Sequence, residues 1–199
     1  MSDLRILDVG CGKGSVVETA FEEMLRGRSY ELVRLDIDPD NKPDYVHDIR
    51  QPLPEELVGQ FDLVMASHVL EHVERSMVML SVIHMASALH HMGELWLVVP
   101  SLEWCAGEIL AGKLTAGVQA CIYGGPEADK PNGYYHHTGF TVPWLRFLVE
   151  NAGLILRKAY QNEFGIHMTA ADGQTRDYTG VQNVVIGAKY VDDPVEAIG

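Results

Sequence analysis

The feature that most constrains the fold is residues 6–14, where a short apolar run meets three alternating glycines. Residues 4–9 have the apolar, β-favouring composition of a strand, and apolar residues recur at helical spacing over residues 15–26. Glycine lets the backbone turn sharply, and it lets a ligand come close where a Cβ would obstruct it. The N–H groups and the positive dipole end of the following helix face the same place. The stretch predicts a strand–turn–helix unit with a ligand at the turn.

The spacing of the glycines indicates which ligand. A dinucleotide fingerprint has the form G-x-G-x-x-G, whereas here the third glycine comes one place early. This spacing disfavours a nicotinamide-dependent oxidoreductase. Residues 6–14 resemble motif I of the class I methyltransferases, which use S-adenosylmethionine. The resemblance implies that the turn approaches the methionine part of the cofactor and that Asp8 holds the turn or the cofactor's amino group. The residues of this turn that we expect at the cofactor are Asp8, Gly10, Cys11, Gly12 and Gly14.

Cys11 occupies a turn position that needs a small residue, so we interpret it as a packing residue rather than a reactive thiol. Cys105 and Cys121 lie far from it in the sequence, and no C-x-x-C pair is present. The cysteines therefore predict neither a disulfide framework nor a metal site. No metal site is predicted elsewhere in the chain.

A second strand is expected over residues 31–37, and it ends at an acid. A carboxylate at this point of a βαβ unit can accept hydrogen bonds from both hydroxyls of a ribose. Asp36 and Asp38 are both candidates, and the resemblance favours Asp36, with Ile37 beside it at the cofactor.

A short third strand over residues 45–49 ends in another acid. The resemblance implies that Asp48 accepts a hydrogen bond from the adenine amino group and that the N–H of Ile49 meets a ring nitrogen. The alternative is that Asp48 only caps the turn before Pro52.

The fourth strand is expected over residues 61–67, and the segment through residue 73 resembles the corresponding segment of small-molecule methyltransferases. Ligand sites lie outside the carboxyl ends of parallel strands, so Ser67 and His68 are expected at the floor of the pocket. His72 reads as a structural residue at the start of the next segment. A helix over about residues 74–91 then ends in two solvent-exposed histidines, His90 and His91, and a fifth strand follows over 94–100.

Residues 101–140 form a long insert between the fifth strand and the next helix. A helix is expected over 103–114, with a loop from Gly117 onward. Long connections inside a domain are usually functional or disordered, and the clustered aromatic residues and histidines argue against disorder. Only three residues precede the first strand, where many relatives carry a covering helix. We therefore expect the insert to act as a substrate lid; the alternative is that the cofactor site is unusually open. His68, His136 and His137 are the candidate catalytic bases, although a structural role is open for each.

The remaining pattern predicts a helix that begins at Thr141 and ends at Gly153, strands over 154–161 and 181–190, and a flexible tail over 191–199. Alternating strands and helices predict an α/β fold. Specifically, we expect one domain over residues 1–190, built on a Rossmann-like, doubly wound, seven-stranded and mostly parallel sheet. An antiparallel C-terminal hairpin is expected at one edge of that sheet.

Charge and hydropathy limit the partners. The formal net charge of −13 and the lack of a basic stripe argue against nucleic acid. No apolar run is long enough to span a bilayer, and no signal peptide is visible, so a cytoplasmic protein is expected.

The resemblance implies a methyltransferase that moves a methyl group from S-adenosyl-L-methionine to an oxygen or nitrogen atom of a small-molecule or sugar-containing acceptor. The alternative is a non-catalytic protein that kept the fold and binds the cofactor or a partner. The sequence leaves the acceptor and the oligomeric state open.

Overall fold

The computed structural model describes residues 4–15, 17, 25–125, 135–169 and 175–189, with backbone only for 165–169 and 175–178. Most of the helix expected over residues 15–26, and all of the expected tail over 191–199, lie outside the described residues.

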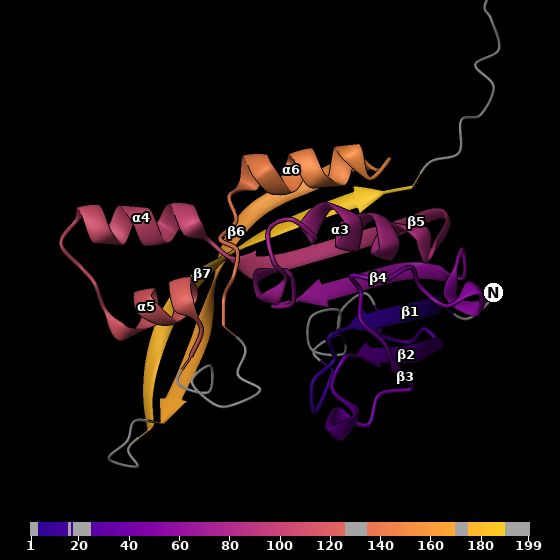
Figure 1. The fold of residues 1–199 in the computed structure, drawn as a ribbon, viewed down its shortest axis with the longest axis horizontal. Helices are drawn as coiled ribbons and strands as arrows, with labels where there is room; N and C mark the ends of the chain where they lie inside the picture. The colour runs from indigo at the N-terminus through magenta and orange to yellow at the C-terminus, as the bar shows by residue number, and fades with distance from the viewer. Residues whose placement is uncertain (1–3, 16, 18–24, 126–134, 170–174, 190–199) are drawn as a thin grey trace, which may run out of the picture.

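The described residues form a seven-stranded sheet with the order β3-β2-β1-β4-β5-β7-β6 (Figure 1). The strands are β1 (Leu4–Val9), β2 (Tyr30–Asp36), β3 (Tyr45–Val46), β4 (Phe61–Ser67), β5 (Leu89–Pro100), β6 (Ile155–Thr169) and β7 (Thr175–Ala188). The first five strands pair in parallel, whereas β7 runs antiparallel to both β5 and β6. The predicted doubly wound sheet with an antiparallel hairpin at one edge is confirmed.

Four α-helices and three short 3-10 helices are described. The α-helices are α3 (Val78–Ser87), α4 (Leu102–Leu110), α5 (Ala116–Tyr123) and α6 (Val142–Asn151), and the 3-10 helices are η1 (Pro39–Asn41), η2 (Glu55–Leu57) and η3 (Leu70–His72). Helices α3 and α6 cover one face of the sheet, whereas α4, α5 and the far part of the β6–β7 hairpin extend beyond the carboxyl ends of β4 and β5 (Figure 1). The insert therefore lies on the side where the parallel strands end.

Alternate residues of the central strands enter two cores on opposite faces of the sheet. Leu7 packs with the buried residues of α3 and α6, such as Met85 and Leu145. The neighbouring Ile6 packs on the other face, in a cluster that includes Val17. Full burial of such side chains contributes about 1.5–3 kcal/mol each, so β1 is fixed firmly between the two layers. This fixes the position of the glycine turn that follows it.

The segment around the end of α3 differs from the sequence prediction. Helix α3 ends at Ser87, and His90 and His91 lie in β5 rather than at a helix end. His90 is also not fully solvated, because its Nε2 lies 2.7 Å from Asp62 Oδ1. The cause is pairing with β4: a Cβ on Gly93 would lie 2.7 Å from the carbonyl oxygen of Phe61, so this glycine permits a close strand contact instead of stopping a helix.

The insert also differs from the prediction. Helix α4 ends at Leu110, and the expected loop from Gly117 onward is instead part of α5. Thr115 accepts a hydrogen bond from the N–H of Val118 and so caps the start of α5, a local signal that the sequence reading overlooked. The predicted start of α6 is confirmed, since Thr141 accepts from the N–H of Trp144. The third strand is shorter than expected, and the two closing strands are longer.

Candidate functional site

A cavity of about 660 Å³ lies at the carboxyl ends of β1, β2 and β4. Seven of the predicted site residues line it: Gly10, Gly12, Asp36, Ile37, Asp48, Ile49 and His68. The other predicted cofactor residues, Asp8, Cys11, Gly14 and Ser67, are not among its lining residues. The sequence prediction therefore identified much of the wall of the cavity.

Two glycines of the turn serve different purposes. Gly10 and Gly12 both have positive φ, +67° and +57°, which L side chains rarely adopt. A Cβ on Gly10 would overlap the side chain of Val69, so this glycine is needed for packing. A Cβ on Gly12 would meet nothing within 4 Å. Because Gly12 also lines the cavity, its missing side chain leaves room where a ligand can approach the backbone.

Asp36 ties the glycine turn to the end of β2. Its side chain is buried, Oδ2 accepts from the N–H of Gly12 at 2.8 Å, and Oδ1 accepts from the N–H of Asp38 at 2.9 Å. Asp38 also lines the cavity, but its Oδ1 accepts from the N–H of Asp40 at 2.9 Å and caps η1. Asp36 is therefore the acid that is held between the two walls of the cavity.

Asp8 lies beneath the same turn and is 1% exposed. Burial raises its pKa to about 6, repulsion from Asp36 adds to the rise, and a hydrogen bond from Ser15 partly opposes it. Among the described residues, no donor reaches its Oδ2. A buried carboxyl oxygen without a donor is costly, so Oδ2 of Asp8 is an unsatisfied acceptor beneath the turn.

Asp48 has partners within its own loop. It accepts from the N–H of Arg50 at 2.9 Å and from the Arg50 side chain at 2.9 and 3.0 Å, and these bonds hold its pKa below the usual value. The turn-capping role that the sequence left open is thus present, while Asp48 also lines the cavity. The next residue, Ile49, is buried, and its carbonyl accepts from His84 Nδ1 at 2.9 Å.

The predicted histidines do not all come together. His68 follows β4 with a φ of +56°, an uncommon conformation for a non-glycine residue, and its Nε2 lies 2.9 Å from Gln182 Oε1. His136 packs against His72, with 5.0 Å between the ring centroids. His137 is exposed and does not line the cavity. Tyr134, which neighbours these histidines in the sequence, lies outside the described residues.

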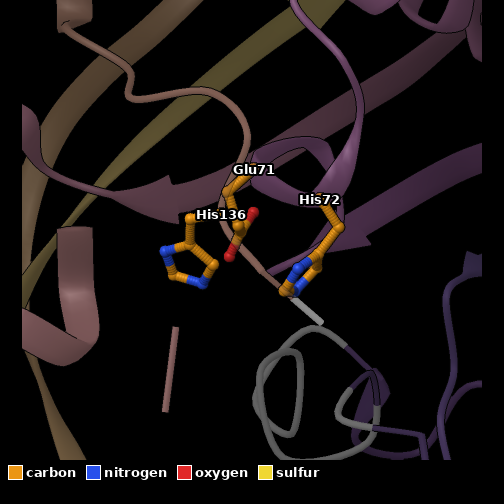
Figure 2. Close-up of side chains that lie close together, drawn as sticks. All are labelled: Glu71, His72 and His136. Atoms are coloured by element: carbon orange, nitrogen blue, oxygen red, sulfur yellow. The ribbon is translucent and has the colours of Figure 1, made fainter. Parts of the chain in front are cut away.

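The sequence reading missed the importance of Glu71 and His72. His72 was expected to be structural, yet it lines the cavity. Glu71 is 1% exposed and lies between His72 and His136 (Figure 2). Burial raises the pKa of Glu71, but the His68 imidazole, 3.2 Å away, and the charges of His72 and His136 lower it by more, so the net pKa is below the usual value. The adjacent acid and histidine in η3, shortly after β4, are a local signal for these two residues but not for the distant His136.

The end of the insert is joined to η3. The carbonyl of Glu71 accepts from the N–H of His137 at 2.7 Å and from that of Thr138 at 3.2 Å. The Thr138 hydroxyl also donates to the carbonyl of Val73 at 2.8 Å and is buried. These bonds fix residues 136–138 beside the part of η3 that lines the cavity.

The described part of the chain contains no helix that is long and apolar enough to cross a membrane.

Comparisons with known proteins identify the family. A family model described as a methyltransferase domain matches residues 2–120. A search of curated proteins found no match. Among solved structures, an S-adenosylmethionine-dependent methyltransferase from Methanosarcina mazei is 16% identical, with a TM-score of 0.64, and the match covers 96% of this chain and 95% of that one.

A second similar structure is the 1,6-didemethyltoxoflavin-N1-methyltransferase of Burkholderia thailandensis with its substrate and S-adenosylhomocysteine bound. It is 12% identical, with a TM-score of 0.55, and the match covers 95% of this chain and 72% of that one. At these identities the structural likeness establishes the fold, and the family match covers more than half of the sequence. The glycine turn, the strand order and the matched domain together show that this chain belongs to the class I S-adenosylmethionine-dependent methyltransferases.

Proposed function

We propose that the cavity binds S-adenosylmethionine and that the protein transfers its methyl group to an oxygen or nitrogen atom of a small-molecule acceptor. The observation that carries this proposal is the continuous cavity, which is lined by residues from β2 and the β3 loop as well as by His68 and His72 beside β4. Since β3 and β4 lie on opposite sides of β1 in the sheet, a ligand in the cavity would extend across the glycine turn.

From the β3 loop through β2 to the turn after β1, the lining residues would contact the adenine, the ribose and the methionine part of the cofactor in turn. The Asp36 carboxylate, which lines the cavity, would accept from the ribose hydroxyls, and the adenine ring would lie beside Asp48 and Ile49. The open space at Gly12 would admit the methionine part. The unsatisfied oxygen of Asp8 would accept from the amino group of that part.

When bound, S-adenosylmethionine supplies an electrophilic methyl group. The protein then has to hold the acceptor atom in line with the methyl carbon and the sulfur, because alignment of two reactants removes a large part of the entropic barrier. Val69 and Val73 provide an apolar wall, and His68 provides a polar group, at the end of the cavity near β4. We propose that these residues bind the acceptor and that His68 contacts its reacting group.

Cavity size and charge support a small acceptor. Pockets for small ligands measure about 300–1,000 Å³, and the volume here falls in that range. A net charge of −13 disfavours a polyanionic substrate. The solved methyltransferase from Burkholderia thailandensis is named for N1-methylation of 1,6-didemethyltoxoflavin, which is bound in its structure. We propose a similar substrate class, including sugar-containing compounds, with the insert over residues 101–140 forming the outer wall of the acceptor site.

A labelling experiment tests this proposal. The purified protein is incubated with methyl-labelled S-adenosylmethionine and, separately, with the small-molecule, RNA and protein fractions of a cell extract. We expect label in a small-molecule product, and no label with the Gly12→Val variant. Label found in RNA or protein would overturn the acceptor class. Binding of S-adenosylhomocysteine without transfer to any fraction would instead support the non-catalytic alternative.

A further inference from the structure

Glu71 presents a buried carboxylate whose charge the surrounding residues do not fully satisfy. Its side chain is 1% exposed, and neither carboxylate oxygen has a hydrogen-bond partner among the described residues. His68 Nδ1 lies 3.2 Å from Oε1 as an ion-pair contact. A buried carboxylate without hydrogen bonds is strongly unfavourable unless a cation compensates it. His68 faces only Oε1, and no hydrogen-bond partner reaches Oε2 among the described residues, so the carboxylate can take a second positively charged partner.

Two imidazoles face this carboxylate (Figure 2). One ligand atom from each of Glu71, His72 and His136 can be chosen so that the three atoms lie within 4.8 Å of one another. Nitrogen and oxygen ligands of one metal ion lie about 2.0–2.2 Å from it, so the three groups need only a small inward movement to share an ion.

The outer hydrogen bonds of both rings favour metal binding. His72 Nδ1 lies 3.1 Å from the carbonyl oxygen of Tyr135, and His136 Nδ1 lies 3.0 Å from that of Cys121. A carbonyl can only accept, so Nδ1 carries the proton in each ring, and the lone pair of the neutral ring is on Nε2. Metal-binding histidines typically donate their other N–H to a backbone carbonyl or carboxylate in this way, which fixes the tautomer and the ring orientation.

The backbone also fixes the three groups relative to one another. Glu71 and His72 belong to η3, whereas His136 comes from the end of the insert. The carbonyl of Glu71 accepts from two N–H groups of the segment that follows His136, and the Thr138 hydroxyl binds the carbonyl of Val73. The site is thus built on two anchored segments rather than on free side chains.

We infer that Glu71, His72 and His136 form a site for a first-row divalent cation, such as Zn²⁺ or Mn²⁺, at the acceptor end of the cavity. Two imidazoles and one carboxylate suit these ions, and three protein ligands leave coordination positions for other molecules. Mg²⁺ should bind more weakly, because it prefers oxygen ligands and near-octahedral geometry. Sites with nitrogen and oxygen ligands generally bind Zn²⁺ more tightly than Mn²⁺, and we expect the same order here.

The position of this site indicates the class of acceptor. His72 lines the cavity, so open positions of the ion would be reached from it. A divalent cation there would orient an acceptor hydroxyl and lower its pKa. The acceptor is then an oxygen compound able to bind a metal, for example one with two neighbouring hydroxyl or carbonyl oxygens. This second step rests on the proposed function, whereas the metal site itself does not.

Calorimetric titration of the full-length protein, after dialysis against EDTA, tests the metal site without any acceptor. The probes are Zn²⁺, Mn²⁺ and Mg²⁺. We expect one equivalent of Zn²⁺ to bind, more weakly bound Mn²⁺, and a loss of Zn²⁺ affinity of 100-fold or more in Glu71→Gln and in His136→Asn. The matched control is His137→Asn, which makes the same substitution at the exposed neighbouring residue and should leave Zn²⁺ affinity unchanged.

Two further measurements keep the test decisive. If the buried variants do not fold, Co²⁺ is added to the wild-type protein, and its visible absorption spectrum must report mixed nitrogen and oxygen ligands. Absence of Zn²⁺ binding by the wild type, or wild-type affinity in a folded Glu71→Gln, overturns the metal site. S-adenosylhomocysteine binding is measured on the same samples. If the wild type does not bind S-adenosylhomocysteine, the proposed function is refuted. The metal site is still decided separately, by the Zn²⁺ titration.

Discussion

Asp8 should make the protein less stable at neutral pH than in mild acid. Burial raises the pKa of this carboxyl from 3.8 to about 6. A rise of about two units, at about 1.4 kcal/mol per unit, corresponds to ~3 kcal/mol. The folded state holds the proton of Asp8 more tightly than the unfolded state does. Ionisation of Asp8 therefore lowers the free energy of unfolding as pH rises from about 4 through 6, and the full loss of stability remains above pH 6. Replacement of Asp8 by asparagine removes the charge with little change in shape.

The assay is urea unfolding of the wild type and Asp8→Asn, followed by circular dichroism at pH 4 and pH 7. At pH 7 the variant should be more stable by up to about 3 kcal/mol, which in a protein of this size shifts the melting temperature by roughly 6–12 °C. At pH 4 the gain should largely vanish, because both side chains are then neutral. A variant equally or less stable at pH 7, or a gain that is the same at both pH values, would refute the reasoning.

Two further predictions concern the walls of the cavity. Asp36→Ala should weaken S-adenosylhomocysteine binding by about 1–3 kcal/mol in a calorimetric titration, because it removes an acceptor for the ribose and for the N–H of Gly12. An equal or larger loss in Asp38→Ala would assign the ribose contact to Asp38 instead. Gly10→Ala should lower the free energy of unfolding by about 1–3 kcal/mol, because its Cβ would overlap Val69. The Cβ of Gly12→Ala would meet no such contact, so this variant should lose less stability in urea unfolding. Equal losses in the two variants would argue against the packing role of Gly10.

Much of the sheet could be predicted because its strands carry local signals. The apolar run before the glycine turn marks β1, and the acids at the end of β2 and just after β3, Asp36 and Asp48, mark the strand ends that line the cavity. The segment after α3 was misread because residues 88–92 continue a helical apolar pattern. Only pairing with β4 shows that Gly93 allows a close approach to Phe61.

The cluster around Glu71 could not be predicted from local sequence. Glu71 and His72 are adjacent, but His136 reaches them only because residues 137 and 138 donate hydrogen bonds to the carbonyl of Glu71. Such backbone contacts between distant segments leave no periodic pattern. The capping signal at Thr115, in contrast, was present in the sequence and would have located α5.

The central claim is that the cavity at the glycine turn is the cofactor site. Calorimetric titration of S-adenosylhomocysteine into the wild type and Gly12→Val tests it most directly, with NAD as the comparison ligand. The account predicts one bound equivalent of S-adenosylhomocysteine in the wild type, no binding of NAD, and loss of binding in a Gly12→Val protein whose circular dichroism shows that it is folded. Wild-type affinity in the folded variant, or preferential binding of NAD, would contradict it.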